Sequence, residues 1–224
     1  MLRFTEIYEM WRRDSSLKSA LKDSRTMLER TNRMFRESVR SLRESEEGKI
    51  EVSIYEEDRE VNRYQQEVRR KVLHHLAITG GLNAVPGLIL VTIVIDIERI
   101  GDYTKNIMEL AVAHPRKLVG GRFEPDVRKI EITVGTMFDR IVSILEAMDA
   151  DAARDLIAES IWIRARCDAI VTDLIKGEEP ALSARDAVAV ALYVRYLKRV
   201  GAHLMNVLSS VVNPFEKIGY RAEG

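Results

Sequence analysis

The sequence predicts an all-α protein whose six main helices arise from a duplicated helical unit. Residues 96–106, DIERIGDYTKN, return a hundred positions later as YLKRVGAHLMN at 196–206, with the arginine, the glycine and the asparagine in register. Between a few clusters of glycine and proline, the chain is rich in Leu, Ala, Glu, Arg and Met, which are good helix formers. Strand candidates that could pair with one another are lacking, so these patterns favour a duplicated helical fold.

The first half is expected to contain three of the helices, with bounds at about Ser16–Ser45, Val52–Thr79 and Pro86–Ala113. The β-branched run at 91–97 would in isolation suggest a buried strand. Helical apolar spacing continues beyond it, however, and decides for a helix. The most apolar stretch, Leu82–Ile95, is shorter than the roughly 20 residues that cross a bilayer, which favours a core helix over a membrane span.

The second half is expected to contain the other three helices, at about Pro125–Met148, Asp151–Lys176 and Ser183–Val212, after a linker at 114–124. Pro125 suits a first helical turn, because the N–H that proline lacks would be unpaired there anyway. Asp151 and Ser183 can act as N-caps, since their side-chain oxygens accept hydrogen bonds from free backbone N–H groups.

A short amphipathic element precedes these helices and carries apolar residues on about one side: Phe4, Ile7, Tyr8 and Trp11. It could dock on a partner or on a membrane surface, but packing on its own bundle is the usual fate of an apolar helix face. The predicted organisation is an N-terminal element at 1–15, a first repeat at 16–114, a linker at 115–124, a second repeat at 125–213 and a tail at 214–224.

Composition excludes several functional classes. The 35 basic residues balance 35 acidic ones and are interleaved with them, so no basic stripe indicates nucleic-acid binding. Cys167 is the single cysteine, which excludes an internal disulfide and fits a reducing compartment. Charged residues interrupt the N-terminal apolar residues, so we expect no signal peptide and a cytoplasmic location.

Oxygen-bearing side chains form two rows at helical spacing. Glu98, Asp102 and Asn106 lie four residues apart on one predicted helix, and Asp58 and Asn62 lie four apart on the preceding one. If the two helices pack side by side, the rows can converge into a site of oxygen ligands. Such a site suits hard or borderline cations, whereas a structural zinc site normally uses Cys or His.

The alternative for these acids is ion pairing with neighbours such as Arg99 and Lys105, which would leave a metal-free interaction module. Gly101 and Gly201 occupy the same position in the two copies, inside strong helices. Glycine costs about 1 kcal/mol there relative to alanine, so we expect the helices to approach closely at both positions.

Enzyme signatures are weak. There is no Gly-rich phosphate loop, nucleophile elbow or HExxH motif, and none of the four histidines follows a glutamate by three positions, as a di-iron centre would require. Cys167 is expected to be a small buried apolar residue, and His74 and His75 to favour the dipole at a helix C-terminus. A hydrolase that activates water at the acids would lack a general acid or base, so we predict no enzyme.

The segment 96–107, DIERIGDYTKNI, closely resembles the PhoU family of phosphate-signalling proteins. The runs DREVN at 58–62 and EVRRKVL at 67–73 look like the second helix of that family, and the resemblance extends from about Ser16 to Val212. It implies two tandem three-helix bundles related by a pseudo-twofold axis. It also implies a non-enzymatic regulator of phosphate uptake or phosphate-responsive signalling, which reaches the membrane by binding a phosphate transporter, a sensor histidine kinase or both.

The resemblance further implies a metal site at the family's acidic motifs, occupied by iron, zinc, nickel or manganese. Glu98 and Asp102 match one motif, with Asn106 after it. Asp58 and Asn62 match the other, where Asn62 replaces the usual acid and contributes no negative charge.

In the second half, the corresponding positions hold Arg164, Asp168, Lys198 and Ala202, a set that should repel a cation. We therefore expect at most one metal site, in the first repeat, and a salt bridge between Asp168 and Lys198. A metal-free module that regulates another ion transporter is the alternative function. Bundles of this size often dimerise. No exposed heptad seam indicates a dimer interface, so the sequence leaves open whether the protein is a homodimer.

Overall fold

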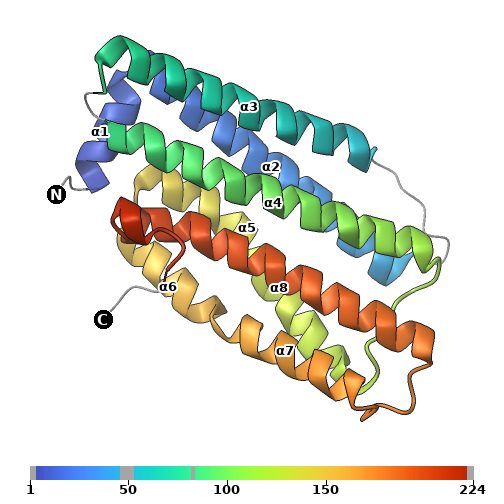
Figure 1. Cartoon of the computed structure of the whole chain (residues 1–224). Coiled ribbons are helices and arrows are strands. Elements are labelled where there is room, and N and C mark those ends of the chain that lie inside the picture. Colours follow the sequence, from blue (N-terminus) through green and yellow to red (C-terminus); the bar gives the residue numbers. More distant parts are fainter. Residues whose placement is uncertain (1–3, 46–52, 82–83, 221–224) are drawn as a thin grey trace.

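The structure, a computed structural model, describes residues 4–45, 53–81 and 84–220. A short helix opens the chain and three long ones follow: α1 (Phe4–Arg13), α2 (Ser15–Glu44), α3 (Ile54–Thr79) and α4 (Ala84–Ala113). The long helices agree with the three that the sequence predicts for the first half, and the β-branched run at 91–97 lies inside α4 (Figure 1).

The second half consists of η1 (Gly121–Phe123), α5 (Glu124–Ala147), α6 (Ala150–Ser160), α7 (Trp162–Ile175), α8 (Ala184–Val212) and η2 (Phe215–Lys217). The single helix predicted for 151–176 is therefore wrong in one respect, because it is interrupted at Ile161. Ile161 keeps helical dihedral angles, φ −60° and ψ −28°, so the interruption is local. It falls where the neighbours change, since α6 packs against both α5 and α8, whereas α7 packs mainly against α8.

Two of the three predicted helix starts are confirmed. Proline stands in the first turn of α5, and the Ser183 hydroxyl accepts a hydrogen bond from the Asp186 N–H at 3.2 Å. The N-cap of α6 is Asp149 rather than Asp151, and Asp149 accepts from the Ala152 N–H at 3.0 Å. The left-handed Met148, with φ 50°, ends α5, so the extended residue that follows it can cap the next helix.

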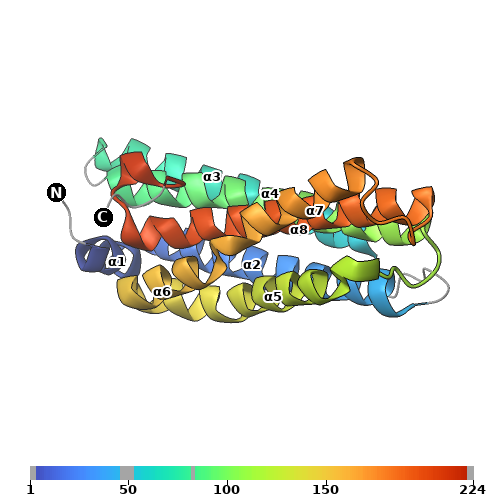
Figure 2. The same cartoon turned by 90° about the horizontal axis from the view of Figure 1, so that it is seen from below.

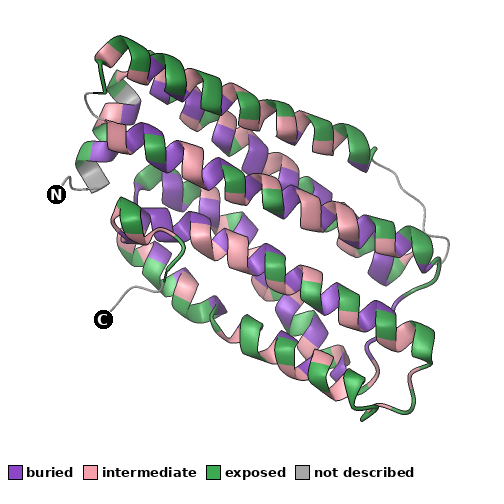
Figure 3. Cartoon of the chain, viewed as in Figure 1, coloured by how far each residue is buried: buried purple, intermediate pink, exposed green. Residues whose placement is uncertain are grey.

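The two helix groups meet along α4 and α8, which lie antiparallel in the middle of the molecule (Figures 1 and 2). On one side α2 and α3 pack against α4, and on the other α5, α6 and α7 pack against α8. Buried residues recur along α2, α4, α5 and α8 (Figure 3). Ile97 and Ile100 of α4 and their counterparts Leu197 and Val200 of α8 are fully buried, so the duplicated segment forms the central helix pair.

Gly101 and Gly201 lie buried in this central pair. A Cβ added at Gly101 would lie 3.5 Å from Val61 Cγ1, and one added at Gly201 would lie 3.7 Å from Val134 Cγ2. These are ordinary van der Waals distances. The expectation that close helix approach requires glycine at both positions is therefore wrong, because the neighbouring helices leave room for a methyl group.

Helix α1 packs on its own bundle, which decides among the alternatives for the N-terminal element. Ile7 and Trp11 are buried, and the Trp11 indole N–H donates to the Pro86 carbonyl at 3.0 Å. Asp14 caps α2, and its Oδ2 lies 2.9 Å from Nδ1 of the buried His75. His75 thus holds the α1–α2 junction rather than the end of its own helix. The side chains of Phe4 and Tyr8 lie outside the described residues.

Candidate functional site

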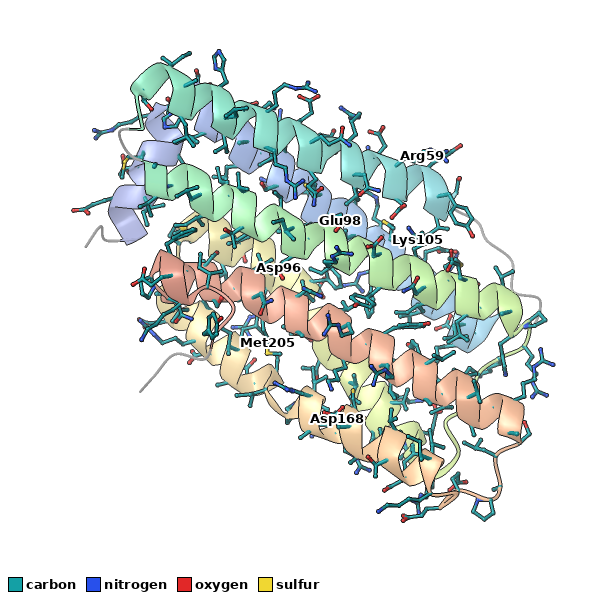
Figure 4. The ribbon with its side chains drawn as sticks, in the orientation of Figure 1. Arg59, Asp96, Glu98, Lys105, Asp168 and Met205 are labelled. Carbon is teal, nitrogen blue, oxygen red and sulfur yellow. The ribbon has the colours of Figure 1, made fainter. Side chains whose placement is uncertain are left out.

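The packing of α3 against α4 brings the predicted acids together around a lysine. The Lys105 ammonium of α4 lies 2.9 Å from Asp58 Oδ2 on α3 and 3.4 Å from Asp102 Oδ1 on its own helix. Glu98 lies two turns before Lys105 on α4, and both labelled side chains stand beside α3 in Figure 4. Lys105 therefore connects the two rows of oxygen ligands.

Arg99 provides a second positive charge along the row. Its Nη1 lies 3.1 Å from Asp102 Oδ2, and its Nε lies 3.6 Å from Glu98 Oε2. The alternative interpretation of the sequence, ion pairing with Arg99 and Lys105, is thus the arrangement that the side chains adopt. The bond from Lys105 to Asp58 across the two helices is the contact that sequence reasoning missed.

The charges around the row shift two pKa values. Burial raises the pKa of Glu98, and the charges of Asp102 and, more weakly, Asp58 raise it further against the opposing effect of Arg99. Burial by itself would lower the pKa of Lys105, but its hydrogen bond to Asp58 and the charges of both aspartates raise it overall. Lys105 is therefore firmly protonated at neutral pH, and Glu98 is a weakened acid beside it.

The two predicted amide ligands do not join this cluster. Asn62 and Asn106 are both half-buried. Among the described residues, the hydrogen bonds and ion pairs of Asp58 and Asp102 run to Lys105 and Arg99 and do not involve either amide. The structure therefore assembles the three acids of the predicted set without their amide partners.

The residues present do not fit a metal ion in this arrangement. Oxygen ligands of a cation must converge on one point at about 2.0–2.6 Å, and the Lys105 ammonium lies between the aspartate oxygens that would have to do so. Within the part of the chain that the structure describes, no group of three His, Cys, Asp or Glu side chains is arranged to hold a metal. The acids of the row are instead neutralised from within the protein.

The second repeat has a single lysine–aspartate pair between its last two long helices. The predicted ion pair between Lys198 of α8 and Asp168 of α7 is confirmed, and the Asp168 side chain is half exposed. Met205 stands at the position equivalent to Lys105, and Ala202 at that of Asp102. Figure 4 shows Asp168 and Met205 well apart on their two helices. A single lysine–aspartate pair therefore replaces the acidic row.

Polar contacts between the repeats were not predicted. Across the α4–α8 interface, Asp96 Oδ1 lies 2.7 Å from His203 Nδ1 and accepts a hydrogen bond from Asn206 at 2.9 Å. The His203 ring stacks on Tyr103, with centroids 5.7 Å apart, and the Arg199 guanidinium lies over the same tyrosine ring. These residues fix the register of the two central helices.

A buried arginine fixes the linker to both repeats. Arg43 near the end of α2 donates to the Leu118 carbonyl and to Glu124, and its Nε lies 2.7 Å from Glu131 Oε1 on α5. Glu131 also accepts a hydrogen bond from the buried Tyr193 hydroxyl at 2.8 Å. Burial raises the pKa of Glu131 in spite of the arginine beside it. The first repeat is thereby anchored on α5 and α8.

A second polar cluster holds the start of α8. His114, just after α4, is buried, and its Nε2 lies 2.9 Å from Asp186 Oδ1. A hydrogen bond from Ser183 and the contact with His114, together with Arg116, lower the pKa of Asp186 to about 2.

Cys167 is buried as predicted, and burial raises the pKa of its thiol to about 12, which makes it a poor nucleophile.

Comparisons with known proteins agree with the two helical repeats and with the fold. A family model of the PhoU domain matches residues 24–111 and again residues 127–211, which are the helices of the two repeats. The crystal structure of PhoU from Pseudomonas aeruginosa superposes with a TM-score of 0.77 at 19% sequence identity, covering 88% of this chain and 95% of that one. At this identity the likeness establishes the fold alone. A comparison with curated protein sequences finds no match.

Proposed function

Because the chain belongs to the PhoU family of regulators, which are not enzymes, we propose that it acts by binding a membrane phosphate transporter or a sensor histidine kinase. Membership implies the regulation of phosphate uptake. The observation that supports the proposal most is the match of both repeats to the PhoU domain, over nearly all of their helices. The hydrolase alternative is excluded by the same membership.

The structure suits a regulator that works by occupying the surface of its partner. Two bundles joined along α4 and α8, and anchored by Arg43 and Asp96, form one packed body. No helix in the described segments is both long and apolar enough to cross a bilayer. As part of this proposal, contact with the membrane is peripheral and passes through the partner, from the cytoplasmic side.

Phosphate uptake in cells tests this proposal directly. Deleting the gene should raise the uptake of radiolabelled phosphate by cells grown in phosphate-rich medium, and the wild-type gene on a plasmid should restore it. A chain truncated after residue 114 provides a control for the need for both repeats. Unchanged uptake in the deletion strain, at high and at low phosphate, would contradict the proposal.

Cross-linking in intact cells identifies the partner. Recovery of a phosphate-transporter subunit or of a sensor kinase, in amounts that depend on the phosphate supply, is the expected result. The alternative of a metal-free module that regulates another ion transporter gains some support from the ion-paired state of the acidic row. It predicts recovery of a different transporter, with no dependence on phosphate.

A further inference from the structure

We propose that Lys105 is the resident cation of the first repeat's acidic row, in the place that a metal ion would need, so that this repeat works without a metal. The proposal concerns the purified chain and does not depend on the identity of its partner. The acidic motif suggests a metal site. The aspartate side chains instead hold an ammonium group, and no described group of acids is arranged to bind a metal.

The Lys105 ammonium group is held by protein oxygens in the way that a bound metal ion would be. Its side chain is 22% exposed and that of Asp58 is 14% exposed, so their contact is largely shielded from water. The ammonium group bridges oxygens from two helices, at 2.9 Å to Asp58 and 3.4 Å to Asp102. An ion that cross-links α3 and α4 would have to make the same two contacts.

A metal ion and the lysine cannot both occupy the row. A divalent ion bound by Asp58 and Asp102 would lie within a few ångströms of the ammonium group and would repel it strongly, because shielding from water weakens dielectric screening. To leave, Lys105 would have to exchange charge-assisted hydrogen bonds for solvent.

The second repeat provides an internal comparison. Met205 occupies the position of Lys105 where Ala202 has replaced the acid equivalent to Asp102. The two side chains have similar length, and a central helix with methionine at this position packs in the same fold. The lysine is thus present in the repeat that has acids to neutralise and absent from the one that has lost them.

Equilibrium dialysis of the metal-stripped protein against Mn²⁺, with thermal melting at each Mn²⁺ concentration, tests the proposal. Mn²⁺ is chosen because oxygen ligands suit it. The wild type should take up no stoichiometric Mn²⁺ and should melt at the same temperature with Mn²⁺ or with EDTA. Lys105→Met should melt about 4–8 °C lower. It should bind one Mn²⁺ at least about tenfold more tightly than the wild type and recover its melting temperature with the ion.

Two variants control for charge and for position. Lys105→Arg keeps the positive charge and should behave as the wild type. Lys198→Met makes the same replacement in the second repeat and should gain no Mn²⁺, since only Asp168 is left there. Stoichiometric Mn²⁺ in the wild type that Asp102→Asn abolishes would overturn the proposal. A Lys105→Met variant that neither binds Mn²⁺ nor is stabilised by it would overturn it as well, because Lys105 would then be an ordinary ion-pair partner.

Discussion

The two repeats link their middle and last helices by a lysine–aspartate contact, yet they place the charges differently. In the first repeat Lys105 reaches from α4 to Asp58 on α3, within a row of further acids. In the second, Lys198 reaches from α8 to Asp168 on α7. Lys198 occupies the position of Glu98, seven residues before that of Lys105. The duplicated fold therefore preserves the attraction between two helices while the residues that supply it have changed.

This difference separates the parts of the repeat that packing requires from those that remain free to change. The apolar positions of the central helices keep their burial in both copies, as Ile97 and Leu197 illustrate. The charged face has instead become an acidic row in one copy and a single ion pair in the other. A partner that contacts both repeats would consequently meet two surfaces of different charge.

Arg43→Met should have the largest effect, because it removes a buried ionic contact between the first repeat and α5. It leaves Glu131 without its counter-charge and Glu124 with that of Arg128 alone, and loss of one partner of a buried ion pair costs about 3–5 kcal/mol. Urea unfolding measures the loss. Arg25→Met, which breaks the exposed pair with Glu146 at the other end of the α2–α5 contact, should leave the midpoint nearly unchanged. Equal losses in both variants would contradict this role for Arg43.

Gly87→Ala gives the first repeat the residue of the second, which has Ala187 at that position. The new Cβ would lie 2.9 Å from Val72 Cγ1, so we expect a destabilisation of about 1–3 kcal/mol from overpacking. At Gly201, where the space is open to a methyl group, alanine should instead stabilise the protein by about 0.5–1 kcal/mol. Thermal melting distinguishes the two signs, and a loss of stability in Gly201→Ala as well would show that α8 has no room for a methyl group at that position.

Asp186→Asn tests the pH dependence that the start of α8 contributes to stability. The folded pKa of Asp186, about 2, lies below its ordinary value of 3.8, so its ionised form stabilises the fold above pH 3.8 and loses this effect as the pH falls towards 2. The difference in melting temperature between wild type and variant should shrink over that range. Trp11→Phe removes the hydrogen bond to Pro86 at the start of α4 and should give a difference that is independent of pH.

Lys198→Met should destabilise the protein less than Arg43→Met or Gly87→Ala. Its pair with Asp168 is half exposed, and exposed ion pairs contribute at most about 1 kcal/mol. The loss should therefore be smaller than that in Lys105→Met, whose lysine serves two aspartates in a more shielded site. Chemical unfolding of the two variants side by side measures the ratio. Equal losses would mean that the number of acids around the lysine is of no consequence.

Much of the helical architecture could be predicted from the sequence, because proline, glycine and capping residues mark most helix ends. Pro125 and Ser183 stand where their side chains suggest. The interruption at Ile161 has no such marker. It depends on which helices lie beside α6 and α7, and this information is not local in the sequence.

The candidate site was less predictable, since helical spacing gives the face of a residue but not its partner on another helix. The row of Glu98 and Asp102 was evident from spacing, whereas the bond from Lys105 to Asp58 depends on the register of α3 against α4. The histidines illustrate the same limit. The aspartate bound by His203 lies 107 residues away in the chain, so no local pattern could assign it.

The two tryptophans make the halves of this molecule separately visible to fluorescence. Trp11 is 1% exposed and sits where α1 meets the first repeat, so undocking of α1 alone would shift its emission to the red. Trp162 opens α7 in the second repeat, where the Lys129 ammonium lies 4.7 Å from its ring centroid. With one tryptophan replaced by phenylalanine at a time, the chain reports in real time which repeat responds when a partner binds.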